Sequence, residues 1–438
     1  MKQFLLFCAL CGWGIGFARG QSTLDTIGMT ALLAQDPTLT GSGVIAMHPE
    51  GVDSLAASPQ FEVNPESPGQ PLGLFAYRSK FGRSGTFPNR VGTESDHADQ
   101  VADAFYGVNG GVAPGLRHVG NYEMEYFFAS VIEAQTPSTA RVVNQSFGFG
   151  PHNAAQDKAY DDYIAEYHLV VATAVGNGGA IATPGDCYNG LGVGAYGGDS
   201  STGPTADGRC KPDITAPAGV TSFSTPLVSG GAAILIQAGR RAGVNAAAAV
   251  DSRTVKALLL TGAVKPSGWS NTPTAPLDPN YGAGVLNVFN SYEELIGGRI
   301  APAASGLSPA GHAPLASGRV SDVARGWDYS AITSDAKREG VSHYRIMTRA
   351  TGALITTLVW NKRYGADALN RLGLYVYDAG GDLLASSVST VDNVQHVYLT
   401  GLDPGTYEIE VVKTAGSAGR AGVVSGREVY ALAWDFGR

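Results

Sequence analysis

Short buried-strand candidates alternate with helical stretches between Gly41 and Leu295. The strand candidates lack the period-2 alternation of a half-exposed sheet, and they are VIAM, RVVNQSF and HLVVATAV (residues 44–47, 141–147 and 168–175). The segments of helical character between them include DHADQVADAFYG and NYEMEYFFASVIEAQ (residues 96–107 and 121–135). Strands buried on both faces need helices above and below the sheet. Residues 41–296 therefore predict a doubly wound α/β domain with a mainly parallel sheet.

A second domain follows residues 297–319, a segment rich in Ala, Pro, Gly and Ser that is typical of a linker. Residues 320–438 then contain short alternating strands separated by turn clusters such as DAGGD and DPG. This pattern predicts an antiparallel β-sandwich. Asp378 and Asp382 are interpreted as hairpin turn residues; a structural calcium ion there is the alternative, and no motif indicates it or any other cofactor.

The first twenty residues are typical of a secretory signal peptide. Lys2 supplies the positive start, residues 4–17 the apolar stretch and residues 18–20 the small residues for cleavage. A retained or lipid-anchored N-terminus is the alternative. Residues 21–40 are expected to form only a short leader. The sequence therefore predicts an exported protein, secreted, periplasmic or at the cell surface, with no membrane span in the mature form.

Charge and cysteine content agree with export. The formal net charge is −8, which argues against nucleic acid or an anionic membrane as partner. Cys8 and Cys11 fall within the predicted signal peptide, which leaves Cys187 and Cys210 for the exported chain. In an oxidising compartment these two are expected to form a disulfide, with two free thiols as the alternative.

Ser222 precedes a long stretch of small and apolar residues that is expected to be a helix buried on all sides. Pro226 is tolerated only in the first turn of a helix, so the helix is expected to begin close to Ser222. A hydroxyl at that point faces the positive end of the helix dipole and unpaired backbone N–H groups, which are the donors that a developing oxyanion needs. The alternative is that Ser222 only caps the helix.

The run TSFSTPLVSG (residues 221–230) is similar to the signature around the catalytic serine of the subtilisin family. The positions that match are Thr221, Ser222, Pro226, Val228 and Gly230. Val220 departs from the pattern, because the family usually has Gly there. The upstream run KPDITAPAG (residues 211–219) also resembles the family. The resemblance implies a subtilisin-like fold and a serine peptidase with Ser222 as nucleophile.

His97 lies in HADQVAD, which resembles the family's HGTHVAG and is followed, as in the family, by GVAP at residues 111–114. The resemblance implies that His97 is the general base. Gln100 and Asp103 stand where the family has its second His and its closing Gly. A surface histidine at the start of a helix capped by a neighbouring residue is the alternative.

Asn177 ends a predicted buried strand in VVATAVGNGG, which is similar to the family's AAGN. The resemblance implies that its side-chain amide donates to the oxyanion. An ordinary Asn-Gly turn is the alternative. Ser146, Phe147 and Gly148 resemble the family's strand that lines the substrate pocket, although Phe147 is equally suited to core packing.

The acid of the triad departs most from the family pattern. Counting along the strand from Gly43 places Glu50 where the family has Asp, whereas counting back from Asp53 places Pro49 there. A carboxylate that accepts the imidazole N–H would fix its tautomer, and Glu can do so as well as Asp. The alternative is that Glu50 is a loop charge and that the triad is broken.

Together these patterns predict a secreted serine endopeptidase that acts on proteins or peptides. No HExxH, P-loop or GxSxG motif is present, which argues against a zinc protease, an NTPase and an α/β-hydrolase. The β domain resembles the pre-peptidase C-terminal domains of bacterial secreted peptidases, and its partner is open. A catalytically inactive binding or adhesion protein that keeps the fold is the alternative function.

Overall fold

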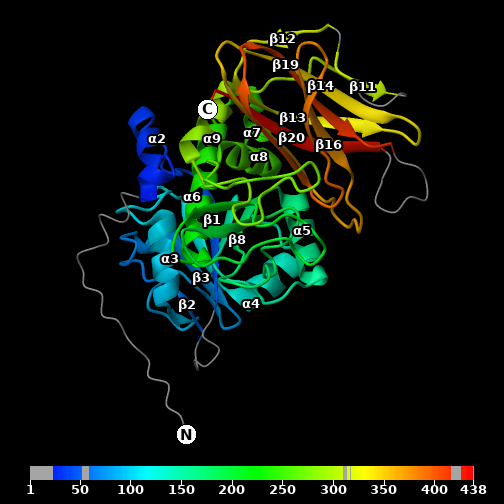
Figure 1. Ribbon diagram of the computed structural model, residues 1–438. Helices are drawn as coiled ribbons and strands as arrows, with labels where there is room; N and C mark the ends of the chain where they lie inside the picture. Colours follow the sequence, from blue (N-terminus) through cyan, green and yellow to red (C-terminus); the bar gives the residue numbers. More distant parts are fainter. Residues whose placement is uncertain (1–22, 52–58, 309–312, 316, 416–425, 438) are drawn as a thin grey trace.

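An eight-stranded sheet forms the centre of the computed structural model, which describes residues 23–51, 59–308, 313–315, 317–415 and 426–437. The strand order is β10-β9-β8-β7-β1-β6-β3-β4 (Figure 1). The strands are β1 Ile45–Glu50, β3 Phe75–Ser79, β4 Gly82–Ser84, β6 His118–Glu123, β7 Val142–Gln145, β8 Val170–Ala174, β9 Leu191–Tyr196 and β10 Ile214–Pro217. All neighbours pair in parallel except β3 and β4, which confirms the predicted mainly parallel sheet. A short parallel pair, β2 Gln60–Glu62 and β5 Thr93–Glu94, lies beside it.

Helices cover both faces of this sheet, as expected for a doubly wound domain. One face packs against α3 Asp96–Tyr106, α6 Thr221–Gly239, α8 Ser252–Gly262 and α9 Val288–Gly297. The other face packs against α4 Met124–Phe127, the π-helical turn Phe128–Glu133 and α5 Ala154–Tyr167. Successive strand residues alternate between the two cores, so that Val142 enters the first and Val143 the second. Within the expected leader, α2 Met29–Gln35 packs against α9.

One expected helix begins later than predicted. The segment 121–135 was expected to be helical throughout, but Asn121 to Glu123 form the end of β6. Polar Asn121 is tolerated in this buried strand because its amide is fully used: it accepts from the N–H of Val63 and donates to the carbonyl oxygens of His48 and Phe61. Because a buried polar residue interrupts the apolar sequence of β6, this strand is hard to recognise from the sequence although it lies inside the sheet.

The C-terminal part forms two facing antiparallel sheets, which confirms the predicted β-sandwich. The larger sheet has the order β11-β14-β19-β16-β17, with β12 beside β14, and the smaller has the order β13-β20-β15-β18. The strands are β11 Ala304–Ser308, β12 Val320–Ser321, β13 Arg325–Ser334, β14 Glu339–Thr348, β15 Gly352–Trp360, β16 Leu372–Tyr377, β17 Leu383–Ser387, β18 Val394–Leu402, β19 Gly405–Lys413 and β20 Gly426–Phe436. Asp378 acts as a turn residue, since its carboxylate accepts from the N–H groups of Gly380 and Asp382.

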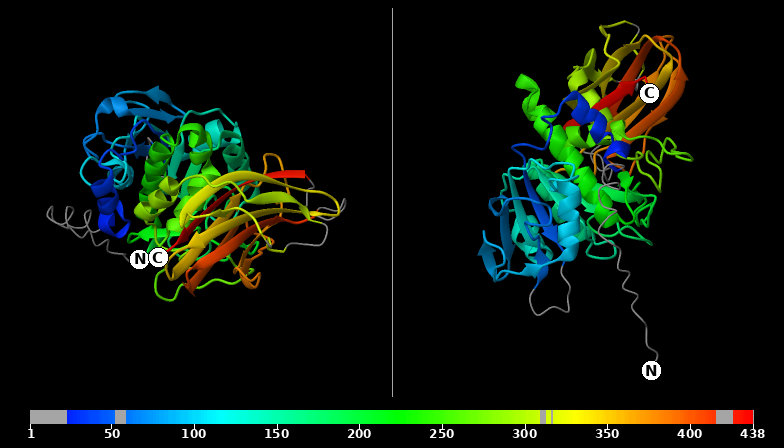
Figure 2. Two further views of the ribbon diagram at one scale, coloured as in Figure 1. Left: turned by 90° about the horizontal axis from the view of Figure 1, so that it is seen from above. Right: turned by 90° about the vertical axis from the view of Figure 1, so that its left-hand side faces the viewer.

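The sandwich has its own hydrophobic core, but one face of its smaller sheet also joins the core of the α/β domain. Helix α8 packs against β15 and β20 of the smaller sheet, and α9 packs against β13 (Figure 2). Leu258 of α8 lies in the same buried cluster as Val359 and Ala431 of these strands. The buried hydroxyl of Thr261 donates to that of Thr357 across the boundary at 2.8 Å. The smaller sheet therefore covers the outer side of the helical layer.

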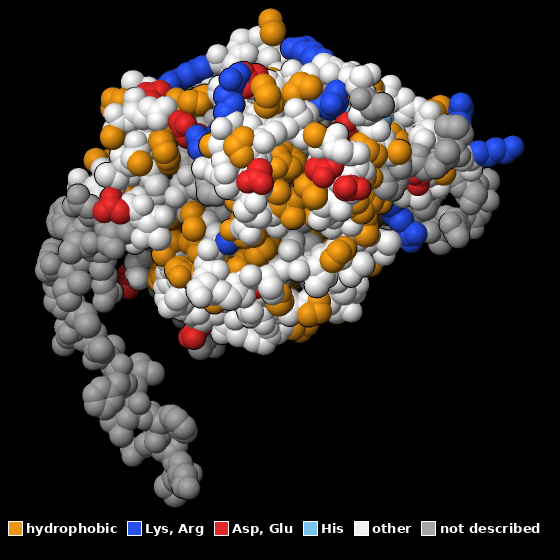
Figure 3. Space-filling model, turned by 45° about the horizontal axis from the view of Figure 1, so that its top comes forward, with side chains coloured by type: hydrophobic (Ala, Val, Ile, Leu, Met, Phe, Trp, Pro, Cys, Tyr) orange, Lys and Arg blue, Asp and Glu red, His pale blue; other side chains and the backbone are white. Residues whose placement is uncertain are grey.

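The surface mixes hydrophobic side chains with acidic and basic ones on the face drawn in Figure 3. Within the residues that the structure describes, none of the helices combines the length and the apolar character that a bilayer span requires.

The expected disulfide is not formed, because Cys187 and Cys210 are both free thiols. Cys187 is buried in the cluster beneath α5, whereas Cys210 packs against the larger cluster on the other face of the sheet. The two side chains are therefore directed into different cores. Burial raises the pKa of Cys210 to about 12, so this thiol stays protonated and unreactive at neutral pH.

Candidate active site

The candidate catalytic residues gather at the carboxyl ends of the strands, at the point where the strand order reverses. From β1 the sheet grows toward β6 and β3 on one side and toward β7 and β8 on the other. Glu50 is the last residue of β1, Ser146 follows β7, and Asn177 follows β8. In open α/β sheets such a reversal leaves a crevice beside the strand ends, where ligands bind.

His97 lies in the first turn of α3 and contacts Glu50. The helix is capped by Ser95, whose hydroxyl oxygen accepts from the N–H of Ala98. His97 Nδ1 lies 2.9 Å from Glu50 Oε1. The carboxylate can only accept here, so Nδ1 carries the proton and Nε2 keeps its lone pair. This is the tautomer that a general base requires.

Glu50 is only 2 % exposed and is surrounded by donors. Its Oε1, which faces His97, also accepts from the N–H of Gly51, and its Oε2 lies 3.5 Å from His48 Nε2. His48 is itself fully buried and bonds through Nδ1 to the hydroxyl of Tyr106 on α3 at 3.0 Å. The site thus contains a second histidine on the far side of the carboxylate.

Sequence reasoning missed His48. The signal was available, because residues two apart on a strand point to the same face, and His48 precedes Glu50 by two positions in β1. A histidine and an acid at this spacing next to the candidate triad acid indicate a shared polar cluster.

The two partners change each other's pKa in opposite directions. Burial alone would raise the pKa of Glu50, but hydrogen bonds and charges from His48 and His97 outweigh it and lower that pKa. Burial alone would lower the pKa of His97, but the hydrogen bond and negative charge of Glu50 outweigh it and raise that pKa above 6.5. Glu50 therefore stays ionised at neutral pH and stabilises the imidazolium form of His97.

Ser222 is the second residue of α6, which packs against α3. The ring of Phe223, the next residue, lies 5.7 Å from the ring of His97. Ser222 Oγ donates to the carbonyl oxygen of Ser146 at 3.2 Å, and the hydroxyl of Ser146 donates back to the carbonyl oxygen of Ser222. Among the described residues Ser222 makes no hydrogen bond with His97, so its hydroxyl has to leave Ser146 before His97 can accept the proton.

Val220 fits the backbone where the family usually has glycine. It has extended dihedral angles, φ −147° and ψ 160°, which suit a β-branched residue. The chain thus reaches the start of α6 without a left-handed residue at this position.

Asn177 holds the N-terminus of α6. Its Oδ1 accepts from both the backbone N–H and the hydroxyl of Thr221, at 2.8 and 2.6 Å. The helix has no side-chain cap of its own, so Asn177 supplies one from the loop after β8. Because Oδ1 of Asn177 accepts these two hydrogen bonds, its Nδ2 group can donate to a ligand at this exposed position.

Ser146, Phe147 and Gly148 form a strip beside Ser222. Ser146 is buried against Ser222, while the half-buried ring of Phe147 packs edge-on against Phe149. A side chain at Gly148 would lie 2.7 Å from the Cβ of Ala182, so only glycine lets this strip approach the neighbouring loop. The strip is thus fixed between Ser222 and the loop that follows Asn177.

Residues 111–284 match the model of the subtilase family, Peptidase_S8. Residues 111–284 thus form a subtilase-family domain. The α/β domain that contains them is here called the subtilase domain. Asn177 and Ser222 lie inside the matched range, whereas Glu50 and His97 precede it. No curated protein matches the sequence.

Three solved structures are similar to parts of this chain. A protease from Pseudoalteromonas arctica is 18% identical, with 64% of this chain and 98% of that one covered and a TM-score of 0.44. The PatG macrocyclase domain is 16% identical, with 63% and 98% covered and a TM-score of 0.42. Tripeptidyl peptidase 2 is 14% identical, with 79% of this chain but only 40% of that one covered and a TM-score of 0.40.

Two groups of side chains outside this crevice have ligand types that could hold a metal ion. One consists of His152, Asp157 and Asp186 in the subtilase domain. The other consists of His343, Glu408 and Glu410 in the β-sandwich.

Proposed function

We propose that this chain is an exported serine endopeptidase with Ser222 as nucleophile, His97 as general base and Glu50 as the acid that orients His97. The subtilase match supports a serine peptidase, a hydrolase whose substrates are proteins or peptides. The observation that carries the finer proposal is the 2.9 Å contact between the buried Glu50 carboxylate and His97 Nδ1. It gives the imidazole the tautomer and the counter-charge that proton transfer needs.

In this proposal Ser222 Oγ attacks the carbonyl carbon of the peptide while His97 Nε2 takes the hydroxyl proton. His97 then gives that proton to the leaving amine, and an acyl-enzyme remains on Ser222. Water activated by the same nitrogen hydrolyses the ester. Glu50 stays ionised throughout and stabilises the imidazolium that forms twice in the cycle.

The oxyanion is stabilised from two directions. Asn177 offers its Nδ2 group, and the backbone N–H of Ser222 belongs to the first turn of α6, where N–H groups have no partner within the helix. The positive end of the α6 dipole adds to both donors. Ser146, Phe147 and Gly148 would then line the pocket for the substrate side chain.

A catalytically silent binding or adhesion protein is the second candidate function. The observation that favours it is the hydrogen bond from Ser222 Oγ to the carbonyl oxygen of Ser146, which holds the hydroxyl away from His97. For both candidates we propose export, because residues 1–20 have the features of a signal peptide.

Labelling with a fluorophosphonate separates the two candidates, because only an activated serine reacts quickly. We expect rapid labelling of the wild-type chain at Ser222. The rate should rise with pH through a transition above 6.5, since the pKa of His97 is raised and only its neutral form can take the proton. The measurement is the labelling rate between pH 5 and 9, with the site identified by mass spectrometry.

Ser224→Ala is a suitable control, because Ser224 lies in the same helical turn with its hydroxyl bonded to the carbonyl of Thr221. It should label like the wild type. Labelling no faster than that of a free serine at every pH would favour the binding protein. A pH transition below 6.5 would contradict the Glu50–His97 contact as the cause.

Asn177→Asp tests the oxyanion donor separately from the helix cap. Aspartate keeps an oxygen to accept from Thr221, and it replaces the Nδ2 donor with a second oxygen. We expect kcat on a chromogenic peptide to fall by about 10²–10³, with a similar KM and an unchanged melting temperature. A variant with normal kcat would show that Asn177 only caps the helix.

A further inference from the structure

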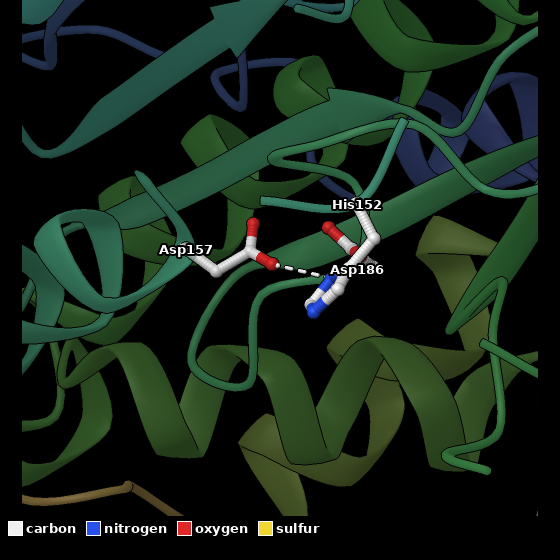
Figure 4. A group of neighbouring side chains, drawn as sticks. All are labelled: His152, Asp157 and Asp186. Atoms are coloured by element: carbon white, nitrogen blue, oxygen red, sulfur yellow. Dashed lines mark hydrogen bonds and ion pairs between the residues drawn. The ribbon is translucent and has the colours of Figure 1, made fainter. Parts of the chain in front are cut away.

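His152, Asp157 and Asp186 of the subtilase domain form a cluster, here called the His–Asp cluster (Figure 4). His152 lies in the loop before α5, Asp157 in the first turn of α5, and Asp186 in the loop before β9. His152 Nδ1 lies 2.6 Å from Asp186 Oδ2 and 3.1 Å from Asp157 Oδ2. The fold therefore brings one imidazole nitrogen against two carboxylates.

The protein does not satisfy these carboxylates fully. Asp157 is 4% exposed and Asp186 is fully buried. Neither oxygen of Asp157 has a hydrogen-bond partner, whereas Asp186 Oδ1 accepts from the hydroxyl of Thr183. Burial and the nearby charge of Asp186 raise the pKa of Asp157 to about 9. Among the described residues the buried Asp157 carboxylate thus lacks a hydrogen-bond donor, and a bound cation would supply a positively charged partner.

We propose that the His–Asp cluster binds a zinc ion through His152 Nδ1 and one oxygen each of Asp157 and Asp186. One imidazole nitrogen with two carboxylate oxygens is a donor set for zinc, while calcium takes oxygen ligands alone. Donors around tetrahedral zinc lie about 3.3 Å apart. The observed separations of 2.6 and 3.1 Å therefore need to open by about 0.7 and 0.2 Å. Two carboxylates neutralise the ion.

The surroundings orient the ligands as an outer shell does around metal sites. Thr183 donates to the oxygen of Asp186 that faces away from His152, and its own hydroxyl oxygen accepts from the N–H of Asn153. The nearby guanidinium of Arg209 pairs with the carboxylate of Asp207 and donates to the main-chain carbonyl oxygen of Asp186. The side chain of His152 is 30% exposed, which leaves a route for the ion and a place for a water ligand.

A bound ion would link the two segments that border the candidate substrate crevice, the strip after Ser146 and the loop after Asn177. The strip after Ser146 is hydrogen-bonded to the loop after Asn177, because Phe149 donates to the carbonyl of Thr183 and Thr183 donates back to that of Gly150. His152 continues the strip, and Asp186 continues the loop. The zinc site itself does not depend on the proposed function.

The second group of metal-binding side chains is less suited to an ion. Both oxygens of Glu408 accept from the N–H of Leu315, and Arg345 lies 3.7 Å from the same carboxylate. His343 lies between Glu408 and Glu410, and its pKa is raised to about 9: burial opposes this rise, but its hydrogen bonds to the two glutamates outweigh it. A protonated His343 already neutralises part of this group. A substitution in this second group therefore provides the matched control for substitutions in the His–Asp cluster.

The test measures zinc binding to the full chain, purified without an affinity tag and stripped with a chelator. We expect calorimetric titration with zinc chloride to give one ion per chain at micromolar affinity or tighter. Zinc at a hundred times its Kd should raise the melting temperature by about 3 °C. Asp157→Asn and His152→Gln should each weaken binding at least 100-fold, and His343→Gln should bind like the wild type.

Two variants are needed because Asp157 is buried and its replacement can alter folding, whereas His152 is partly exposed. Melting curves of the metal-free variants identify any that do not fold. Binding weaker than about 100 μM in the wild type would overturn the proposal. It would also be overturned if both cluster variants kept full affinity, or if only His343→Gln lost it.

Discussion

Ser222→Ala and His97→Ala are each expected to lower peptide hydrolysis by about 10⁶, while the fold is preserved. Ser222 is half-buried in the first turn of α6, and loss of its hydroxyl removes only the hydrogen bond from its Oγ to the carbonyl oxygen of Ser146. His97 is 40% exposed, so its removal leaves the core of α3 in place. The measurement is kcat/KM on a chromogenic peptide, with melting curves recorded beside it.

The double variant sharpens this prediction. If Ser222 and His97 act together in one catalytic step, the loss of either one already removes that step. The double variant should then be scarcely less active than either single variant. Hydrolysis by Ser222→Ala at the wild-type rate, with an unchanged melting curve, would rule out Ser222 as the nucleophile.

Glu50→Gln is expected to lower kcat by about 10⁴, the loss seen when a triad aspartate becomes an amide in the serine-protease template. Glutamine keeps the size of the side chain but can present an N–H to His97 Nδ1, which favours the wrong tautomer. It also removes the negative charge that raises the pKa of His97. The measurement is kcat across the pH range, in which the surviving activity should titrate at a lower pH than in the wild type.

Glu123→Gln is the matched control for this prediction. Glu123 pairs with Glu50 in register on the neighbouring strand and is also buried, but its carboxylate accepts from the N–H groups of Glu125 and Tyr126. We expect activity within a few-fold of the wild type. Asp53, the next carboxylate along the chain, lies outside the described residues. If Glu50→Gln stays near the wild-type rate while Asp53→Asn is inactive, Glu50 is the wrong acid.

Local sequence patterns predicted the elements that carry the candidate nucleophile and base. The start of α6 followed from Pro226 and the apolar run after Ser222, and the start of α3 followed from its capping residue. Both signals depend on residues within one or two helical turns. They could therefore be read without any knowledge of the tertiary structure.

Contacts between distant segments could not be predicted in this way. The two counts that left Glu50 uncertain differ by one residue, and only the packing of β1 against α3 brings its carboxylate to His97. The disulfide prediction was wrong for the same reason, because the spacing of Cys187 and Cys210 does not reveal that their side chains pack into different hydrophobic clusters. The His–Asp cluster likewise joins a loop, a helix and a second loop, and no spacing motif encodes it.

The common core of α8 and the smaller sheet limits how such a chain can be rearranged during evolution or in the laboratory. A protein cut near residue 297 would expose the face of α8 that contacts Val359 and Ala431, an apolar surface prone to self-association. Exchange of the sandwich for that of a relative would require both halves of this interface to change together. The β-sandwich therefore completes the packing of the subtilase domain and cannot be removed without exposing α8. We expect the two parts to unfold cooperatively.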